Sequence, residues 1–211
     1  MKISTSMLSV TQDKKEKMNE LNESITDYFH VDVMDGNFVS NNTVKEMDEF
    51  LNDSEKPLDI HLMVQDIKSY INKYISFQPK IITFHVEVNT VNLEECIDKV
   101  QANAILAGLA INPETDLELL TPYLEKIDVV LIMSVHPGKG GQSFMKEKTI
   151  QKLKQLQEKR CQNHLYYLIE VDGGINLDTI SFVKDADIIV SGSYITNGNI
   201  NENIMRLKEG K

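Results

Sequence analysis

The sequence predicts an α/β protein of the closed parallel (β/α)8 class, the TIM barrel. Three observations lead to this prediction: eight short β-rich runs, helical patterns between them, and no linker or low-complexity tract anywhere in residues 1–211. The runs lie near residues 2–9, 28–33, 58–63, 81–85, 105–111, 129–134, 166–171 and 187–190. We therefore expect a single (β/α)8 barrel domain over residues 1–211.

Each run is short and rich in apolar and β-branched residues, from the first at residues 2–9 to the last at 187–190. Between the runs, residues 91–100 and 146–160 show the clearest helical spacing. The apolar positions are Leu93, Cys96, Ile97 and Val100 in one stretch, and Ile150, Leu153 and Leu156 on one face of the other. Pro113 and Asn176, after the fifth and seventh runs, occupy positions where helix-start signals belong.

The rival fold is an open doubly wound sheet. Its usual nucleotide-binding signature, G-x-G-x-x-G after the first strand, is absent, because the first run continues into Ser9-Val-Thr-Gln-Asp13. A chain of 211 residues is short for a (β/α)8 barrel, so the loops must be economical.

Composition excludes several classes of protein. The longest apolar run, Val129-Val-Leu-Ile-Met133, is too short to span a bilayer, and the N-terminus lacks the apolar region of a signal peptide. Cys96 and Cys161 have no paired spacing and are interpreted as free thiols. A net charge of −10 argues against nucleic-acid binding and against long-range attraction of anionic substrates. We expect a cytoplasmic protein with no membrane or nucleic-acid partner.

Histidines and aspartates at the ends of three runs suggest a metal site. His30 and Asp32 are two residues apart in the second run, so they face the same side of a strand. His61 lies near the end of the third run, and Asp172 directly follows the seventh. A lone His–Asp pair is more often a structural hydrogen bond, but these four together favour one divalent ion, Zn²⁺, Fe²⁺, Mn²⁺ or Co²⁺. Two carboxylates on one metal can also move protons.

Other polar residues accompany this set. Asp59 and Glu170 lie two residues before His61 and Asp172, and we interpret them as supporting or structural groups rather than ligands. At the end of the fourth run, His85-Val-Glu87 repeats the spacing, and we interpret it as a hydrogen-bonding pair at the barrel mouth. The remaining histidines, His136 and His164, have no recognisable context, and we expect His164 on the surface.

Glycine-rich turns follow three late runs: Gly138-Lys-Gly-Gly141, Gly173-Gly174 and Ser191-Gly-Ser193. Each alone is a weak signal. Together they suggest a phosphate site, in which unobstructed backbone N–H groups and a short helix N-terminus approach the phosphate oxygens. Such local groups would capture an anion that the acidic chain does not attract from a distance.

Methionines recur at the ends of the runs. Core filling is the usual role of Met34, Met63 and Met133. Because Met34 and Met63 lie two residues after Asp32 and His61, they share the ligands' face of the strand. We expect these methionines to line the site, where their polarizable sulfurs tolerate a flat, electron-rich intermediate.

Five ordered segments of the chain resemble the ribulose-phosphate 3-epimerase family, and the resemblance runs from Ile3-Ser-Thr-Ser-Met-Leu-Ser9 to the last strand. The segments are His30-Val-Asp-Val-Met-Asp-Gly-Asn-Phe38, Leu58-Asp-Ile-His-Leu-Met-Val64, Met133-Ser-Val-His-Pro-Gly-Lys-Gly-Gly-Gln142, Glu170-Val-Asp-Gly-Gly-Ile175 and Val190-Ser-Gly-Ser193. The resemblance implies a (β/α)8 barrel that interconverts D-ribulose 5-phosphate and D-xylulose 5-phosphate in the pentose phosphate pathway. It also implies a divalent metal, typically zinc, and a homo-oligomer.

The resemblance also implies roles for individual residues. The implied metal ligands are His30, Asp32, His61 and Asp172, and the implied acid/base pair is Asp32 and Asp172. The implied substrate contacts are Ser6, His61, Gly138, Lys139, Gly140, Gly141, Asp172, Gly173, Gly174, Gly192 and Ser193. The chemistry is consistent, since inversion at a carbon beside a ketone needs one carboxylate to remove a proton and another, protonated, to return one to the opposite face.

Three departures from the family pattern touch no expected ligand. Lys139 replaces a large apolar residue in the sixth loop, Val39-Ser-Asn41 replaces Val-Pro-Asn, and Ile25-Thr26 replaces Gly-Ala. We hypothesise that Lys139 contacts the phosphate when its loop closes; an exposed lysine without a role is the alternative. Two other functions stay open: a hexulose-phosphate 3-epimerase acting on allulose 6-phosphate, and a non-catalytic barrel that binds a metal or a sugar phosphate.

Overall fold

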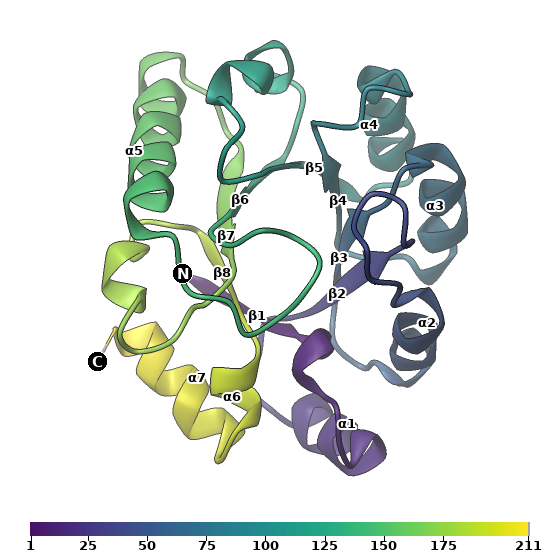
Figure 1. The fold of residues 1–211 in the computed structure, drawn as a ribbon, viewed down its shortest axis with the longest axis vertical. Coiled ribbons are helices and arrows are strands. Elements are labelled where there is room, and N and C mark those ends of the chain that lie inside the picture. The colour runs from purple at the N-terminus through teal and green to yellow at the C-terminus, as the bar shows by residue number, and fades with distance from the viewer. Residues whose placement is uncertain (211) are drawn as a thin grey trace.

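The computed structural model describes residues 1–210, and the strands within them close into one parallel barrel in the order β1-β2-β3-β4-β5-β6-β7-β8. The eight strands confirm the predicted fold class. They are β1 (Lys2–Ser6), β2 (Tyr28–Met34), β3 (Leu58–Met63), β4 (Ile81–His85), β5 (Leu106–Ile111), β6 (Val129–Met133), β7 (Leu168–Asp172) and β8 (Ile188–Ser191). Figure 1 shows the barrel with helices around it.

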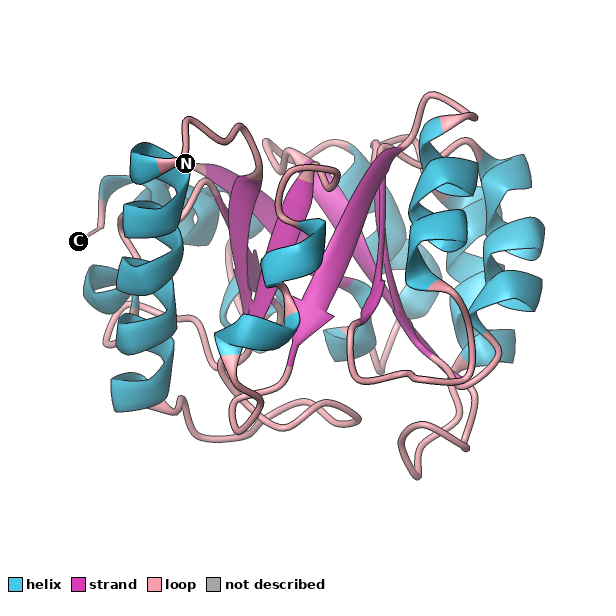
Figure 2. Ribbon diagram, turned by 90° about the horizontal axis from the view of Figure 1, so that it is seen from above, coloured by secondary structure: helices cyan, strands magenta, loops and turns pink. Residues whose placement is uncertain are grey.

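Helices cover the outside of the strands, as Figure 2 shows from the side. They are α1 (Lys14–Asn22), α2 (Val44–Asp53), α3 (Ile67–Tyr74), α4 (Leu93–Gln101), α5 (Lys146–Gln162), α6 (Ser193–Thr196) and α7 (Ile200–Glu209). In the same view the N-terminus lies at one rim of the barrel and the longer loops lie at the opposite rim, where the strands end. Among residues 1–210, no helix combines the length and the apolar content that a membrane crossing requires.

Two of the expected helices are replaced by single turns of 3₁₀-helix. The segment after β5 forms η3 (Leu117–Leu119) and η4 (Thr121–Tyr123), and the segment after β7 forms η5 (Ile180–Phe182). The helix start expected at Pro113 is therefore wrong: Asp116 caps the first turn, and Pro122 lacks the N–H that a continuous α-helix would need. The other 3₁₀ turns are η1 (Met7–Ser9) and η2 (Ile75–Phe77).

The first strand is shorter than expected. It ends at Ser6 instead of residue 9, because the chain turns into η1. The hydroxyl of Ser9 donates to the carbonyl oxygen of Ser6 at 2.8 Å, and the N–H of Val10 donates to Met7 at 3.0 Å. These local hydrogen bonds take the place of pairing with a neighbouring strand.

The expected inner face of α5 is partly wrong. Leu153 and Leu156 are buried, but Ile150 is 37 % exposed. The buried face runs through Thr149 and Lys152 instead, which gives the helical spacing i, i+3, i+4 and i+7 with the two leucines. Lys152 is accommodated because its aliphatic stem packs inside while its ammonium group donates to the carbonyl oxygen of Thr115.

The barrel interior changes character from one rim to the other. Near the strand starts, an apolar layer is contributed by the even-numbered strands; it consists of Tyr28, Ile81, Val129 and Ile188. Farther along the strands the interior becomes polar on β2 and β3. There the register pairs His30 with Asp59 and Asp32 with His61. The alternate residues Val31 and Val33 point outward and pack with the helices in the main core.

Candidate active site

The four expected metal ligands lie together at the carboxyl ends of β2, β3 and β7. One ligand atom from each of His30, Asp32, His61 and Asp172 lies within 4.8 Å of the others. His30 and His61 are fully buried, and Asp32 is nearly so. Closure of the barrel brings Asp172, distant in sequence, beside the other three.

His30 is held by a carboxylate on the neighbouring strand. Its Nδ1 lies 2.7 Å from Asp59 Oδ2, which also accepts a hydrogen bond of 2.7 Å from Ser4 Oγ. With Nδ1 committed to Asp59, the other ring nitrogen, Nε2, faces Asp32 Oδ1 at 3.2 Å and Asp172 Oδ2 at 3.9 Å. Asp59 thus holds the ring of His30, and it lies outside the four-residue set.

Asp32 lies at the centre of this set. Its Oδ1 is 3.2 Å from His30 Nε2 and 3.3 Å from His61 Nδ1, while its Oδ2 accepts from Ser6 Oγ at 3.0 Å. Its backbone carbonyl oxygen accepts from Thr43 Oγ1 at 2.5 Å. Hydrogen bonds to side chain and backbone therefore fix the orientation of this carboxylate.

The residues present fit a divalent metal ion. Among residues 1–210, the buried His30 Nε2 has no hydrogen-bond partner, although two carboxylates lie near it. Burial works against a charged His30, yet the carboxylates of Asp59 and Asp32 raise its pKa well above the ordinary value. The site thus stabilises positive charge at this nitrogen. Two imidazoles and two carboxylates form a mixed N/O donor set suited to Zn²⁺, Fe²⁺, Mn²⁺ or Co²⁺.

The two carboxylates have opposite proton affinities. Burial, together with the negative charges of Asp32 and Asp59, raises the pKa of Asp172 to about 7. Burial also acts on Asp32, but His30 and His61 outweigh it and hold the pKa of Asp32 well below its usual range. One member of the pair therefore favours the protonated form and the other the ionised form, which is the arrangement that acid/base catalysis uses.

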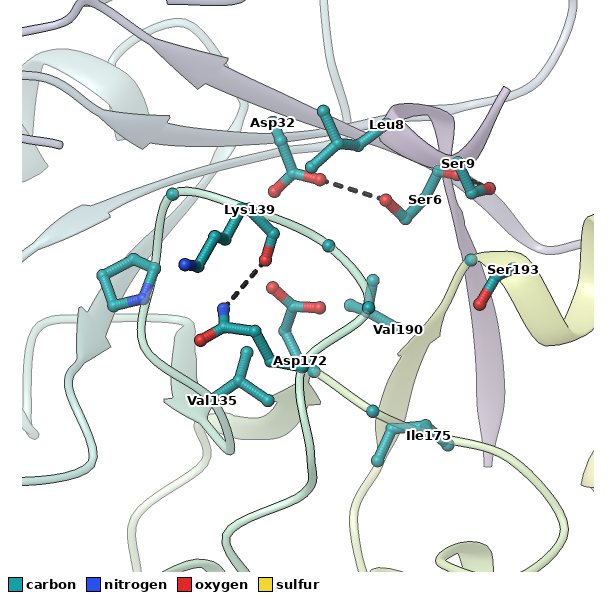
Figure 3. Close-up of a pocket in the computed structure, with 18 of the residues that line it drawn as sticks. Ser6, Leu8, Ser9, Asp32, Val135, Lys139, Asp172, Ile175, Val190 and Ser193 are labelled. Atoms are coloured by element: carbon teal, nitrogen blue, oxygen red, sulfur yellow. Dashed lines mark hydrogen bonds between the residues drawn. The ribbon is translucent and has the colours of Figure 1, made fainter. Parts of the chain in front are cut away.

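A cavity of about 650 Å³ opens beside these carboxylates, and Figure 3 shows Asp32 and Asp172 directed toward it. Most residues expected at the site line it: Ser6, Asp32, Met34, Met63, Met133, Gly138, Lys139, Gly140, Gly141, Asp172, Gly173, Gly174, Gly192 and Ser193. His30 and His61 do not, since they are buried behind Asp32. A substrate contact of His61 remains a prediction.

Comparison with known protein families gives a match over most of the chain. The family model described as the ribulose-phosphate 3 epimerase family matches residues 2–196. The chain belongs to this family. Epimerases are isomerases, so the chain is an enzyme of that class.

Curated relatives within the epimerase family are similar over most of the chain. A ribulose-phosphate 3-epimerase of Schizosaccharomyces pombe is 37% identical over 187 residues, which cover 85% of this chain and 79% of the relative. One of Helicobacter pylori strain J99 is 35% identical over 201 residues, 92% of this chain and 90% of the relative. One of Escherichia coli K12 is 35% identical over 176 residues, 80% and 76% of the two chains.

Solved structures with low sequence identity share the epimerase chain's fold. KGPDC from Streptococcus mutans has a TM-score of 0.70 at 12% identity and covers 99% of this chain and 96% of its own. A 3-hexulose-6-phosphate synthase from Salmonella typhimurium has a TM-score of 0.67 at 14% identity, with coverage of 100% and 98%. These likenesses support the barrel fold of this chain, and they carry no argument about its chemistry.

Two glycines of the family motifs are required by close packing at the cavity. A Cβ on Gly173 would lie 2.4 Å from Val135 Cγ2, and φ at this residue is +116°. A Cβ on Gly192 would lie 3.0 Å from Ser9 Cβ. A side chain at either position would therefore collide with neighbouring residues of the cavity wall.

Sequence reasoning missed several residues of the candidate site. Ser9, Asn41, Gln142, Asn176 and Tyr194 line the cavity. Gln142 Nε2 donates to the carbonyl oxygen of Lys139 at 2.8 Å and so braces the glycine turn. Gln142 directly follows Gly141 in the sequence, and this position beside the glycine turn could have identified it as a site residue.

Proposed function

We propose that this epimerase interconverts D-ribulose 5-phosphate and D-xylulose 5-phosphate by moving a proton at carbon 3, as in the pentose phosphate pathway. The observation that carries the proposal is the pair Asp32 and Asp172, which border one cavity and have pKa values displaced in opposite directions. Inversion at carbon 3 requires one ionised and one protonated group, and this pair supplies both.

The proton on carbon 3 lies beside the ketone and is weakly acidic. In one direction, the ionised Asp32 removes it and the electron pair moves toward the ketone, forming an enediolate. Protonated Asp172 then delivers its proton to the opposite face of carbon 3, and the product has inverted configuration. The reverse reaction exchanges the two roles, and exchange with solvent restores the starting protonation.

We propose that His30, Asp32, His61 and Asp172 hold one divalent ion, with zinc as the leading candidate. A bound ion of this kind would stabilise negative charge that develops on the ketone and hydroxyl oxygens. Asp32 and Asp172 would then be both ligands and proton carriers, and His30 only a ligand. The buried His30 Nε2, unpaired within residues 1–210, is the atom that most needs such a partner.

The phosphate of the substrate would bind at the glycine turns. Gly138–Gly141, Gly173, Gly174, Gly192 and Ser193 line the same cavity as the two carboxylates. The net charge of −10 makes local capture necessary, because the molecule as a whole repels an anion. Lys139 lines the same cavity with a positively charged side chain, and we propose that it adds a contact to the phosphate.

Three methionines would form the apolar part of the substrate site. Met34, Met63 and Met133 all line the cavity, and each is at most 2 % exposed. Their thioethers offer no strong hydrogen bonds and can pack against a flat intermediate. They would also keep water away from the enediolate while it exists.

Exchange of the carbon 3 proton tests the reaction. The protein, loaded with Zn²⁺ or Co²⁺, is incubated in D₂O with D-ribulose 5-phosphate, and deuterium at carbon 3 and formation of D-xylulose 5-phosphate are followed by NMR. We expect both. Faster exchange on allulose 6-phosphate would assign the chain to hexulose phosphates instead, and tight binding of either sugar without exchange would indicate a non-catalytic barrel.

We propose that residues 1–211 act as a single catalytic domain, in the cytoplasm, as a homo-oligomer whose only other partner is the sugar phosphate. The acidic surface, with its net charge of −10, supports the absence of a nucleic-acid partner.

A further inference from the structure

A chain of side-chain contacts runs from the site toward the fourth strand. His61 Nε2 lies 2.9 Å from His85 Nε2, and His85 Nδ1 lies 3.0 Å from Glu87 Oε2. On its other side, His61 Nδ1 lies 3.3 Å from Asp32 Oδ1. Two imidazoles thus connect two carboxylates through three contacts.

The middle of this chain is shielded from water. His61 and His85 are both fully buried. The ring of Phe38, from the loop after β2, covers His85 at a centroid distance of 4.6 Å. The imidazoles themselves stack at 5.0 Å with an angle of 28° between their planes. Each ring nitrogen must therefore satisfy its hydrogen bonding with the neighbour seen in the structure.

Glu87, at the end of this row of contacts, determines which atoms donate and which accept the hydrogen bonds. Glu87 Oε1 accepts from the N–H of Asn112 at 2.7 Å, so this carboxylate is already committed as an acceptor. Although burial opposes it, hydrogen bonds from His85 and Asn112 lower the pKa of Glu87. An ionised carboxylate can only accept, so the proton between Glu87 and His85 belongs to His85 Nδ1.

The proton on His85 Nδ1 in turn determines which nitrogen of His61 carries a proton. In a neutral imidazole with a proton on Nδ1, Nε2 is an acceptor. His85 Nε2 therefore accepts the proton carried by His61 Nε2, and His61 Nδ1 is left with its lone pair. That lone pair faces the Asp32 carboxylate at 3.3 Å. In this tautomer the nitrogen and the carboxylate oxygen form no hydrogen bond with each other, and both can bind one cation.

We propose that His85 and Glu87 are positioning residues that hold His61 in the tautomer whose Nδ1 is free to bind the metal ion. The inference rests on the metal centre of the proposed function, and it assigns to β4 a part in building that centre. It also gives the two histidine ligands matching support. Asp59 orients His30 through Nδ1 and leaves Nε2 free, while His85 orients His61 through Nε2 and leaves Nδ1 free.

The test is the affinity for Co²⁺, measured by competition with a chromophoric chelator and by the visible spectrum of the bound ion. His85→Leu removes the acceptor, and we expect the dissociation constant to rise about 10–100-fold. In His85→Gln, the amide oxygen can accept from His61 while its NH₂ donates to Glu87, so we expect most of the affinity to return. His164→Gln replaces an exposed histidine and serves as the control with wild-type affinity.

A second measurement remains informative even if His85→Leu fails to fold. In the zinc-loaded wild-type protein, long-range proton–nitrogen NMR correlations assign the proton on each ring. We expect His61 to carry it on Nε2 and His85 on Nδ1. A proton on His61 Nδ1 would overturn the proposal, as would unchanged Co²⁺ affinity and spectrum in a folded His85→Leu protein.

The outcomes separate this inference from the proposed function. If the affinities follow the expected order but no sugar phosphate exchanges its carbon 3 proton, the epimerase proposal fails and the positioning role stands. If the wild-type protein binds no Co²⁺ or Zn²⁺, the metal centre and the positioning role fall together.

Discussion

The interior wall built by β2, β3 and β7 and the wall built by β5 and β6 line one barrel with opposite chemistry. The first carries six ionisable side chains, and the second a separate apolar cluster. The ionisable set is His30, Asp32, Asp59, His61, Glu170 and Asp172. The apolar cluster is Ala110, Leu131, Met133 and Val135. Both sets occupy the same part of the strands, so the barrel separates charge from hydrocarbon around its circumference.

The buried ionisable groups of the first wall lower the stability of the fold. Within the described residues, both carboxylate oxygens of Glu170 and one of Asp59 are buried without a hydrogen-bond partner. Burial and the charge of Asp59 raise the pKa of Glu170 well above its ordinary value. Such groups oppose folding, and the apolar wall and the outer core must offset them. We therefore expect substitutions on the two walls to affect different properties, activity on one and stability on the other.

The largest effect is expected from Asp172→Asn on the polar wall. Asparagine keeps the size of the side chain but cannot donate or take up the proton, so turnover should fall by roughly 10²–10⁴-fold or more while the fold is retained. Turnover is measured on D-ribulose 5-phosphate, and folding by circular dichroism. Asp185→Asn changes an exposed aspartate before β8 and is the control. Near-wild-type turnover in Asp172→Asn would refute the two-carboxylate assignment.

The matching change on the apolar wall is Leu131→Ala. Leu131 is fully buried in the apolar cluster, so its truncation should lower the free energy of unfolding by about 2–5 kcal/mol. Turnover per folded molecule should remain within a few-fold of the wild type. Chemical denaturation gives the stability, and Leu119→Ala, at a leucine that is 45 % exposed, should cost far less. A loss of turnover without a loss of stability would contradict the separation of the two walls.

A smaller effect is expected from the titration of Asp172 in the metal-free protein. It should change the free energy of unfolding by about 1–3 kcal/mol across the pH range. The pKa of Asp172 is raised to about 7 in the fold, above the value of about 4 in an unfolded chain. Its protonated form therefore contributes stability that is complete below pH 4 and lost as pH rises to 7. Asp172→Asn lacks this loss.

Denaturation of chelator-treated wild type and Asp172→Asn across this range should show the variant gaining relative stability as pH rises. Parallel curves would mean that Asp172 titrates in the fold as it does in water.

The sequence was sufficient for the barrel and for the four clustered residues because both follow from strand periodicity. Apolar runs separated by helical patterns predicted every strand, and the i, i+2 rule placed His30 and Asp32 on one side of β2. Strand ends were less accurate, since local hydrogen bonds such as Ser9 to Ser6 decide them. Lys152 misled the prediction of the α5 face because a buried lysine stem looks polar in sequence.

The role of His85 and Glu87 could not be predicted in the same way. Their spacing was visible, but the contact with His61 depends on how two rings on neighbouring strands are turned toward each other. The register pairs His61 with Thr83, and only the side-chain conformations bring His85 Nε2 to His61 Nε2. Spacing within one strand predicts which residues share a face, whereas contacts between strands require the register and the rotamers.

The smallest effect is expected at the cavity rim, where the chain departs from the family pattern. Lys139 is exposed and lines the cavity in the turn braced by Gln142, so it adds positive charge beside the polar wall. Lys139→Ala should raise the Michaelis constant a few-fold, with kcat little changed, because a screened charge–phosphate contact contributes about 1 kcal/mol. The rise should shrink with added salt. Lys154→Ala, at a side chain that is 76% exposed, controls for net charge. Equal Michaelis constants in the two variants would make Lys139 a lysine without a role in binding.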